Sequence, residues 1–237
     1  MTVNAEDPRV IAGLAAQGAG RSALLEAGAV HVGWKAGMGT AAAKTATGLA
    51  APIVGFLTDR TRHGGGSEIG LEGFGNPLLE PEVAVRLGAD LPAGSSVNET
   101  AAAISHVGPA IEVVDIGDAS DLEAVLAGNV FHRAFLLGEL EPLTGDLGDV
   151  RLRVQVDEQP PLEAIDPRKA LGDLEVVVQA IADQLRLAGT GARAGDVIIT
   201  GSAIPPIPLG TVAQVVVELS GGQVAARFTP TDKLDID

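Results

Sequence analysis

The sequence predicts a fold of the α+β class. Segments with the apolar, β-branched composition of strands outnumber helical segments, and the two kinds do not alternate strictly along the chain. A doubly wound parallel sheet requires that alternation, so it is not expected. Neither a GxGxxG sequence after a strand nor a Walker A sequence occurs, which argues against the usual nucleotide-binding domains.

Helical segments are few. An Ala-rich N-terminal stretch has apolar residues at helical spacing, although Gly18 and Gly20 could divide it into two short helices, and Gly28 is its expected end. The longest helix is expected to open at Pro167, because proline is favoured at the first helical position. The expected helices comprise residues 8–28, 41–47, 121–127 and 167–188.

Strands account for much of the remainder. Gly221-Gly222 predicts a hairpin turn between the last two strands, and the glycine-rich residues 60–70 predict a mobile loop or lid. We expect one large domain at residues 31–237, preceded by a helical segment at residues 1–30. The expected strands comprise residues 31–37, 53–57, 80–87, 110–115, 130–140, 150–157, 196–200, 212–219 and 224–228.

Composition narrows the classes of partner and site. The net charge is −15 with no basic cluster, and aromatic residues are scarce, so neither nucleic acid nor an anionic membrane is an expected partner. The absence of cysteine excludes disulfides, thiolate zinc sites and cysteine nucleophiles. The N-terminus lacks a signal-peptide pattern, and the uncharged run at residues 197–217 is interrupted by prolines. We therefore expect a cytoplasmic protein.

The sequence Glu80-Pro81-Glu82 is the strongest candidate for a site. On an extended strand the two glutamates project from one face, with Cα atoms roughly 6.5–7 Å apart. A hard divalent cation would explain two carboxylates beside the apolar residues that follow. The alternative is a solvated edge strand on which Pro81 discourages further pairing.

Three further charged residues have unusual settings. Glu112 interrupts an apolar strand at residues 110–115, where a buried carboxylate is costly unless it is paired, protonated or bound to metal. Lys35 lies among small and apolar neighbours, where it either extends to solvent or pairs with an anionic ligand. Asp59 ends an apolar stretch, as loop and capping aspartates also do. Asp115 competes with Glu112 as a metal ligand, and equally fits a strand end.

Other familiar sites are not expected. The four histidines, His31, His63, His106 and His132, include no pair with the i, i+4 spacing of a zinc-binding helix. The G-x-S-x-G sequence of many serine hydrolases is absent.

Five ordered blocks resemble the fumarylacetoacetate hydrolase superfamily, and most closely its 2-keto-4-pentenoate hydratases and 4-oxalocrotonate decarboxylases. The resemblance extends from about residue 30 to residue 228. The blocks are Gly-Trp-Lys-Ala-Gly (33–37), Gly-Phe-Leu-Thr-Asp (55–59), Glu-Pro-Glu running into Leu-Gly-Ala-Asp-Leu-Pro (80–92), Pro-Ala-Ile-Glu-Val-Val-Asp (109–115) and Gly-Asp-Val-Ile-Ile-Thr-Gly-Ser (195–202).

The resemblance implies a fold, a cofactor and a set of site residues. The implied fold is a mixed β-sheet roll with helices packed outside, and residues 31–237 become the catalytic domain. The implied cofactor is Mg²⁺ or Mn²⁺. The implied ligands are Glu80, Glu82 and Glu112; the implied catalytic residues are Lys35, Asp59 and His132; and the implied substrate-binding residues are Lys35, Asn129 and Thr200.

The implied chemistry begins with chelation of the carboxylate and C2 oxygen of a 2-oxo or 2-hydroxydienoic acid. The cation stabilises the enolate, Lys35 neutralises the substrate carboxylate or donates a proton, and Asp59 or another carboxylate acts as base. Hydration and decarboxylation both use such a site, so the metal ligands do not discriminate between them.

One block departs from the hydratase pattern. The hydratases usually carry Asp-Asn-Ala-Ser-Ser where this chain has residues 128–133, Gly-Asn-Val-Phe-His-Arg. Asn129 is retained but the serine is missing, and either His132 or Arg133 substitutes for it or both are ordinary structural residues. The segment after Lys35 also differs, with Ala-Gly-Met-Gly-Thr in place of Ile-Gly-Leu-Thr-Ser.

The predicted function is that of a Mg²⁺-dependent hydratase, a lyase that adds water to a 2-hydroxy-2,4-dienoate in aromatic catabolism. The alternatives are a decarboxylase, a tautomerase or a C–C hydrolase of another 2-oxo acid, and an inactive paralogue that assists a partner enzyme. The expected partners are a small 2-oxo or 2-hydroxydienoic acid, further copies of the chain in a homo-oligomer, and an enzyme of the same pathway.

Overall fold

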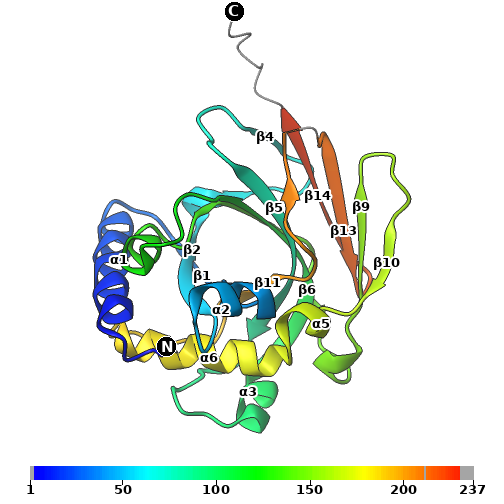
Figure 1. Ribbon diagram of the computed structural model, residues 1–237. Coiled ribbons are helices and arrows are strands. Elements are labelled where there is room, and N and C mark those ends of the chain that lie inside the picture. Colours follow the sequence, from blue (N-terminus) through cyan, green and yellow to red (C-terminus); the bar gives the residue numbers. More distant parts are fainter. Residues whose placement is uncertain (1–2, 211, 230–237) are drawn as a thin grey trace, which may run out of the picture.

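Two β-sheets form the framework of the protein (Figure 1). The computed structural model describes residues 3–210 and 212–229. The larger sheet has the strand order β2-β1-β11-β5-β6-β7-β3, with β12 paired to β5 and β8 paired to β6. The smaller sheet has the order β10-β9-β13-β14-β4. Both parallel and antiparallel pairs occur, and helices lie outside the curled larger sheet, which confirms the α+β class and the mixed roll.

Most strands alternate in burial or are buried on both faces, as expected for a curled sheet covered by helices and a second sheet. The strands of the larger sheet are β1 (His31–Gly37), β2 (Ile53–Thr58), β3 (Arg62–His63), β5 (Pro77–Leu87), β6 (Ile104–Asp115), β7 (His132–Leu137), β8 (Glu141–Pro142), β11 (Val197–Ser202) and β12 (Ile207–Pro208). Those of the smaller sheet are β4 (Glu68–Gly70), β9 (Leu152–Val156), β10 (Leu162–Ile165), β13 (Gln214–Leu219) and β14 (Gly222–Thr229).

The helices begin and end where capping residues permit. Asp7 caps the first helix through the backbone N–H of Arg9, and Ser96 and Glu99 form a capping box on the third. The helices are α1 (Pro8–Glu26), α2 (Ala41–Thr47), α3 (Val97–Ala103), α4 (Leu122–Ala127), α5 (Arg168–Leu171) and α6 (Leu174–Leu187), with short 3₁₀ turns η1 (Asp59–Thr61) and η2 (Leu147–Asp149).

Three expectations about elements need correction. The stretch 8–28 forms the single helix α1, because Gly18 and Gly20 sit on its surface without breaking it. The long helix at 167–188 is divided into α5 and α6, because Gly172 adopts φ 80 between them. Residues 60–70 are not simply a loop, since β3 pairs with β7 and β4 pairs with β14.

The hydrophobic core joins both sheets and the outer helices. Helix α6 turns its apolar face inward through Val178, Ile181 and Leu185, while α1 contributes Val10 and Leu14. Strands β13 and β14 pack against β6. Among the described residues, no helix is long and apolar enough to cross a membrane.

Strand β5 lies at the centre of the larger sheet, between β11 and β6. The solvated-edge interpretation of Glu80-Pro81-Glu82 is therefore wrong. A proline in a central strand lacks a ladder hydrogen bond, and here the pairing of β5 with β11 is irregular between Ile199 and Ser202, opposite this segment. The interruption turns the backbone N–H of Gly201 onto the Glu82 carboxylate, at 2.7 Å.

Candidate functional site

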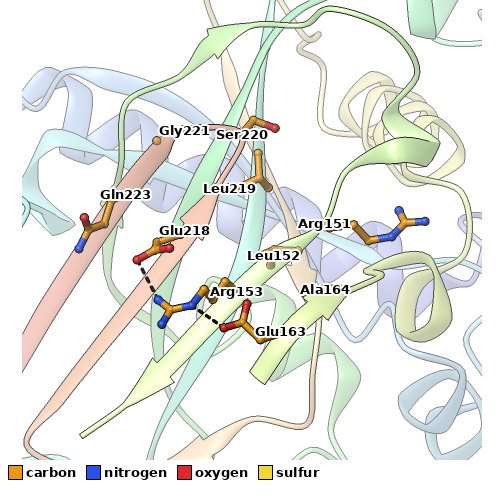
Figure 2. A pocket seen from close by; sticks show the side chains of 11 residues that line it. Arg151, Leu152, Arg153, Glu163, Ala164, Glu218, Leu219, Ser220, Gly221 and Gln223 are labelled. Carbon is orange, nitrogen blue, oxygen red and sulfur yellow. Dashed lines mark hydrogen bonds and ion pairs between the residues drawn. The ribbon is translucent and has the colours of Figure 1, made fainter. Parts of the chain in front are cut away.

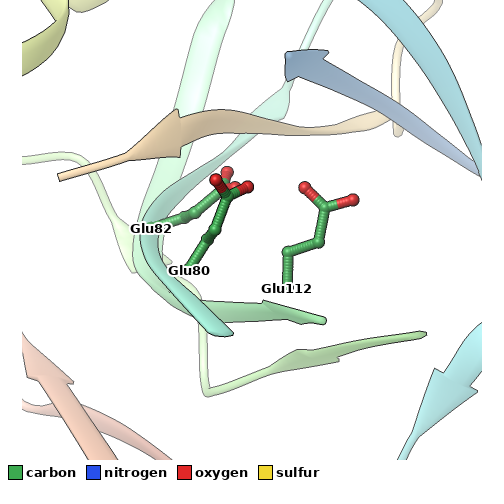
Figure 3. A group of neighbouring side chains, drawn as sticks. All are labelled: Glu80, Glu82 and Glu112. Atoms are coloured by element: carbon green, nitrogen blue, oxygen red, sulfur yellow. The ribbon is translucent and has the colours of Figure 1, made fainter. Parts of the chain in front are cut away.

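Three glutamates from two adjacent strands meet inside the curled sheet (Figure 3). Glu80 and Glu82 project from one face of β5, and Glu112 lies directly opposite Glu80 on β6. One carboxylate oxygen of each lies within 4.8 Å of the others. Like charges directly opposite one another destabilise a sheet, so this arrangement needs a compensating positive charge.

Two fully buried oxygens of this group have no hydrogen-bond partner among the described residues. Glu82 and Glu112 are completely buried, and their Oε1 and Oε2 atoms, respectively, are unpaired within the described structure. An unpaired buried carboxylate oxygen is costly, and it is a ligand that Mg²⁺, Mn²⁺ and Ca²⁺ prefer. Because Glu80 adds a third carboxylate, the residues fit a hard divalent cation.

Glu112 is also held by two cationic or donor groups. Lys35 Nζ and His132 Nδ1 each lie 2.6 Å from its Oε1 atom. Lys35 is almost fully buried, and its Nζ also donates to the Val130 carbonyl at 3.0 Å. This pairing explains how a lysine of β1 can be buried, and it leaves the second oxygen of Glu112 free for a cation.

The hydrogen bonds of His132 define its tautomer. Its Nε2 atom lies 2.9 Å from the Thr61 hydroxyl, and burial, opposed by Glu112, lowers the pKa of the imidazole. A neutral ring facing the Glu112 carboxylate carries its proton on Nδ1, so Nε2 accepts from Thr61. Both ring nitrogens are thereby engaged, and His132 orients Glu112.

The pKa shifts of the three glutamates differ in direction. Burial, together with the neighbouring Glu112 charge, raises the pKa of Glu80 to about 7 and raises that of Glu82 well above its usual value. Burial acts in the same direction on Glu112, but the Lys35 charge and the His132 hydrogen bond outweigh it and lower the Glu112 pKa. A proton or a cation therefore accompanies Glu80 and Glu82, whereas Glu112 is ionised.

These pKa shifts predict how the metal-free protein responds to pH. Because the folded-state pKa values of Glu80 and Glu82 exceed their unfolded values, the folded chain binds more protons than the unfolded chain. The stability that the folded chain gains from binding these protons is complete below the unfolded-state pKa. It is lost as the pH rises through the folded-state pKa. In a chelator, the free energy of unfolding should fall from about pH 5 to about pH 8.

Mn²⁺ should reverse this loss, because the cation replaces the protons. Thermal unfolding across the pH range, with chelator and with saturating Mn²⁺, measures both effects. A chelated protein of constant stability across the interval would contradict the assignment.

The remaining predicted residues occupy different positions. Asn129 bonds through both ends of its amide to the Phe56 backbone, and the buried Thr200 hydroxyl donates to the Val83 carbonyl. Asp59 is exposed at the end of β2, where its carboxylate accepts from the Val30 backbone N–H at 2.7 Å. The structure thus brings together Lys35, His132 and the three glutamates, and not Asp59.

Two contributors were not anticipated from sequence. The Val130 carbonyl holds Lys35, and Thr61 holds His132. The unusual block at residues 128–133 was the available signal for Val130, whereas an isolated threonine in a glycine-rich segment gives no comparable signal.

A cavity of about 260 Å³ reaches the carboxylate cluster at Glu80. Lys35 and Glu80 form its charged part, and most of the remaining wall is apolar. Lys35 is the sole cationic side chain among its described lining residues. The apolar wall consists of Ala36, Met38, Ala43, Val114, Ile116, Ala119, Val130, Phe131, Leu171 and Pro206.

A larger cavity of about 560 Å³ lies on the smaller sheet and is a weaker candidate (Figure 2). Its central Arg153 is already paired with Glu163 at 2.8 Å and with Glu218 at 3.0 Å. These ion pairs satisfy the charges without a ligand, and both partners are well exposed to water. The described lining contains no group of unpaired buried polar atoms.

No family model matches the sequence. A 4-oxalocrotonate decarboxylase from Pseudomonas sp. is 28% identical over 191 residues, which cover 78% of this chain and 73% of the relative. A 2-hydroxyhexa-2,4-dienoate hydratase from Comamonas testosteroni is 28% identical over 187 residues, which cover 75% of this chain and 70% of the relative.

Solved structures agree with these relatives. The 4-oxalocrotonate decarboxylase from Pseudomonas putida G7, complexed with magnesium and adipate, has a TM-score of 0.79 at 27% identity and covers 88% of this chain and 82% of its own. A protein assigned to the fumarylacetoacetate hydrolase family, from Yersinia pestis CO92, has a TM-score of 0.60 at 18% identity, covers 84% and 93%, and shows the fold alone. The curated relatives of this chain are therefore hydratases and a decarboxylase, and its structural neighbours include a 4-oxalocrotonate decarboxylase and a protein of the fumarylacetoacetate hydrolase family, in agreement with the sequence motifs.

Proposed function

We propose that this chain is a divalent-cation-dependent hydratase that adds water to a 2-hydroxy-2,4-dienoate. The observation that carries the proposal is the pair of buried, unpartnered oxygens on Glu82 and Glu112, beside Glu80 and Lys35 at the base of an apolar cavity. Relatives named as a 2-hydroxyhexa-2,4-dienoate hydratase and a 2-keto-4-pentenoate hydratase support the same class of reaction.

Glu80, Glu82 and Glu112 would hold Mg²⁺ or Mn²⁺. The cation would supply Lewis-acid stabilisation of the negative charge that develops on the C2 oxygen of the substrate. Structures of a related decarboxylase with magnesium and with calcium support a cation at this site.

Lys35 is the side chain best placed to act on the bound acid. Its ammonium group is fixed by Glu112 and by the Val130 carbonyl, and it also borders the cavity. It neutralises the substrate carboxylate, gives a proton to the carbon chain as the dienol is converted to its keto form, and regains a proton from the C2 hydroxyl group, so that it ends as the ammonium. His132 keeps Glu112 ionised and oriented, because its Nδ1–H donates to the Glu112 carboxylate. Its Nε2 atom is held by the Thr61 hydroxyl.

The assignment of the group that activates water rests on the resemblance. Asp59 remains our proposed general base, although its exposed carboxylate bonds the Val30 backbone. The resemblance also implies Thr200 and Asn129 as substrate-side residues; Thr200 remains proposed in that role, whereas the Asn129 amide is engaged by the Phe56 backbone. Asp59→Asn should leave Mn²⁺ affinity unchanged and lower the turnover number if Asp59 is that base.

The cavity wall favours hydration over decarboxylation. A 2-oxo dicarboxylate such as 4-oxalocrotonate would place its second carboxylate against an apolar wall, whose described residues offer no cation beyond Lys35. Burying that charge without a partner is costly, whereas an uncharged dienoate tail matches the wall. Decarboxylation is the second candidate because one relative is a 4-oxalocrotonate decarboxylase.

The test uses both substrates with the Mg²⁺-loaded protein. We expect loss of the ultraviolet absorbance of 2-hydroxypenta-2,4-dienoate and formation of 4-hydroxy-2-oxopentanoate, with no CO₂ released from 4-oxalocrotonate. Release of CO₂ without hydration would select the decarboxylase. Inertness toward both compounds and toward longer dienoates would overturn the proposed function.

The proposed setting is a cytoplasmic homo-oligomer that associates with an enzyme of the same pathway. The resemblance alone supports the oligomer and the partner enzyme. Sedimentation of the purified chain measures the oligomer directly.

A further inference from the structure

Three consecutive residues beside the site adopt a backbone conformation that is rare for residues other than glycine. Asn129, Val130 and Phe131 have φ values of 58, 55 and 62, in the left-handed region. Asparagine tolerates this region, but a β-branched valine rarely adopts it, and runs of such residues are rarer still. The surrounding structure must therefore hold this left-handed turn, residues 129–131, in place.

The side chain of Asn129 ties the turn to strand β2. Its Oδ1 atom accepts from the Phe56 backbone N–H at 2.7 Å, and its Nδ2 donates to the Phe56 carbonyl at 3.0 Å. Gly55 makes this approach feasible, because a Cβ atom there would lie 2.9 Å from Asn129 Oδ1 and 2.7 Å from Lys35 Cγ. The amide is thus fully used within the protein, and Asn129 is absent from the cavity lining.

The turn delivers one backbone carbonyl and two side chains to the site. The Val130 carbonyl accepts from Lys35 Nζ at 3.0 Å, and the side chains of Val130 and Phe131 line the cavity. Glu112 is the other acceptor of Lys35 and is also a proposed cation ligand. The Val130 carbonyl is therefore the one contact that orients the Lys35 ammonium independently of the carboxylate cluster, among the hydrogen bonds of the described residues.

We propose that Asn129 is a positioning residue, which fixes the left-handed turn so that the Val130 carbonyl aims Lys35 at the substrate. This inference rests on the proposed function, because it assigns Lys35 the proton-transfer role. It replaces direct substrate binding by Asn129 with action through the backbone. A misplacement of about 1 Å at a reacting group can reduce a rate about 100-fold, so the effect should be large.

The decisive variant is Asn129→Gly. Glycine adopts the left-handed conformation without strain, so the substitution removes the two bonds to Phe56 and retains the backbone preference of the position. The matched control is Ser220→Gly, which makes the same kind of change at an exposed residue with φ 51 in the turn between β13 and β14. Both variants are assayed with Mn²⁺ below their unfolding temperatures.

We expect Asn129→Gly to lower kcat about 100-fold while Mn²⁺ affinity stays within about twofold, and Ser220→Gly to change neither. A crystal structure of Asn129→Gly should show the Val130 carbonyl displaced from Lys35 Nζ. Unchanged kcat, a loss confined to Mn²⁺ affinity, or an intact contact between Lys35 and Val130 would overturn the proposal. If the wild-type chain turns over no dienoate, the proposed function fails, and the position of Lys35 in the variant crystal still decides this inference.

Discussion

The Glu82→Gln variant should lose Mn²⁺ binding and activity while its metal-free form becomes more stable. The substitution replaces a buried carboxyl group that has an unpartnered oxygen, lies near two other carboxylates and must take up a proton when no cation is bound. The glutamine carbonyl can still accept from the Gly201 N–H, and its amide can donate to a neighbouring carboxylate. We expect Mn²⁺ affinity to fall at least about 100-fold and kcat about 1,000-fold.

The opposite signs make this prediction demanding. A substitution that merely damages the fold lowers stability and activity together. Removal of a cation ligand from a strained site instead raises the stability of the metal-free protein and lowers its activity. Calorimetric titration with Mn²⁺, steady-state kinetics and unfolding in chelator give the three measurements. Glu123→Gln, at an exposed position of α4, is the control that should change none of them. Metal-free Glu82→Gln that is less stable than the parent would contradict our account of the cluster.

The Lys35→Met variant should lose activity but retain Mn²⁺. Methionine fills much of the volume of the buried lysine stem, but it cannot donate to Glu112, to Val130 or to substrate. We expect kcat to fall about 1,000-fold, and Mn²⁺ affinity to match or exceed that of the parent, because a positive charge has been removed beside a ligand. Removing one partner of a buried ion pair should also destabilise the metal-free protein by about 3–5 kcal/mol.

Mn²⁺ should restore most of that stability, since a cation then compensates Glu112 in place of the ammonium group. Unfolding of Lys35→Met with chelator and with Mn²⁺ separates this electrostatic effect from poor packing, which metal would not repair. The exposed Lys169→Met substitution on α5 is the matched control. Loss of Mn²⁺ binding in folded Lys35→Met would show that the lysine supports the cation site and does not act on substrate.

Much of the fold was predictable because its signals are local. The helix at residues 41–47 and the strand at residues 31–37 are confirmed at their predicted bounds, since capping and apolar periodicity operate over a few residues. The helix at 167–188 was predicted as continuous, because its apolar periodicity spans the break at Gly172. The short strands at Arg62–His63 and Glu68–Gly70 depend on partners far along the chain, which periodicity does not report.

The site divides in the same way. A two-residue strand period is enough to put Glu80 and Glu82 on one face, and the apolar setting of Glu112 marks it as unusual before any pairing is known. The surroundings of Asp59 could not be anticipated from sequence. Its contact with Val30 forms because the start of β1 lies beside the end of β2. The role of His132 likewise depends on Glu112 and Thr61, which lie in two other segments.

The sequence by itself determined the two-carboxylate face and the five ordered blocks, which carry the resemblance to the superfamily and the chemistry that the resemblance implies. Only the tertiary structure decided that Glu80-Pro81-Glu82 lies in a central strand, and that one oxygen of Glu82 and one of Glu112 are left unpaired inside the sheet. It also decided that Lys35 is fixed between Glu112 and the Val130 carbonyl. The physical reason is that side-chain direction follows from local backbone geometry, whereas burial, ion pairing and pKa depend on which distant segments pack together.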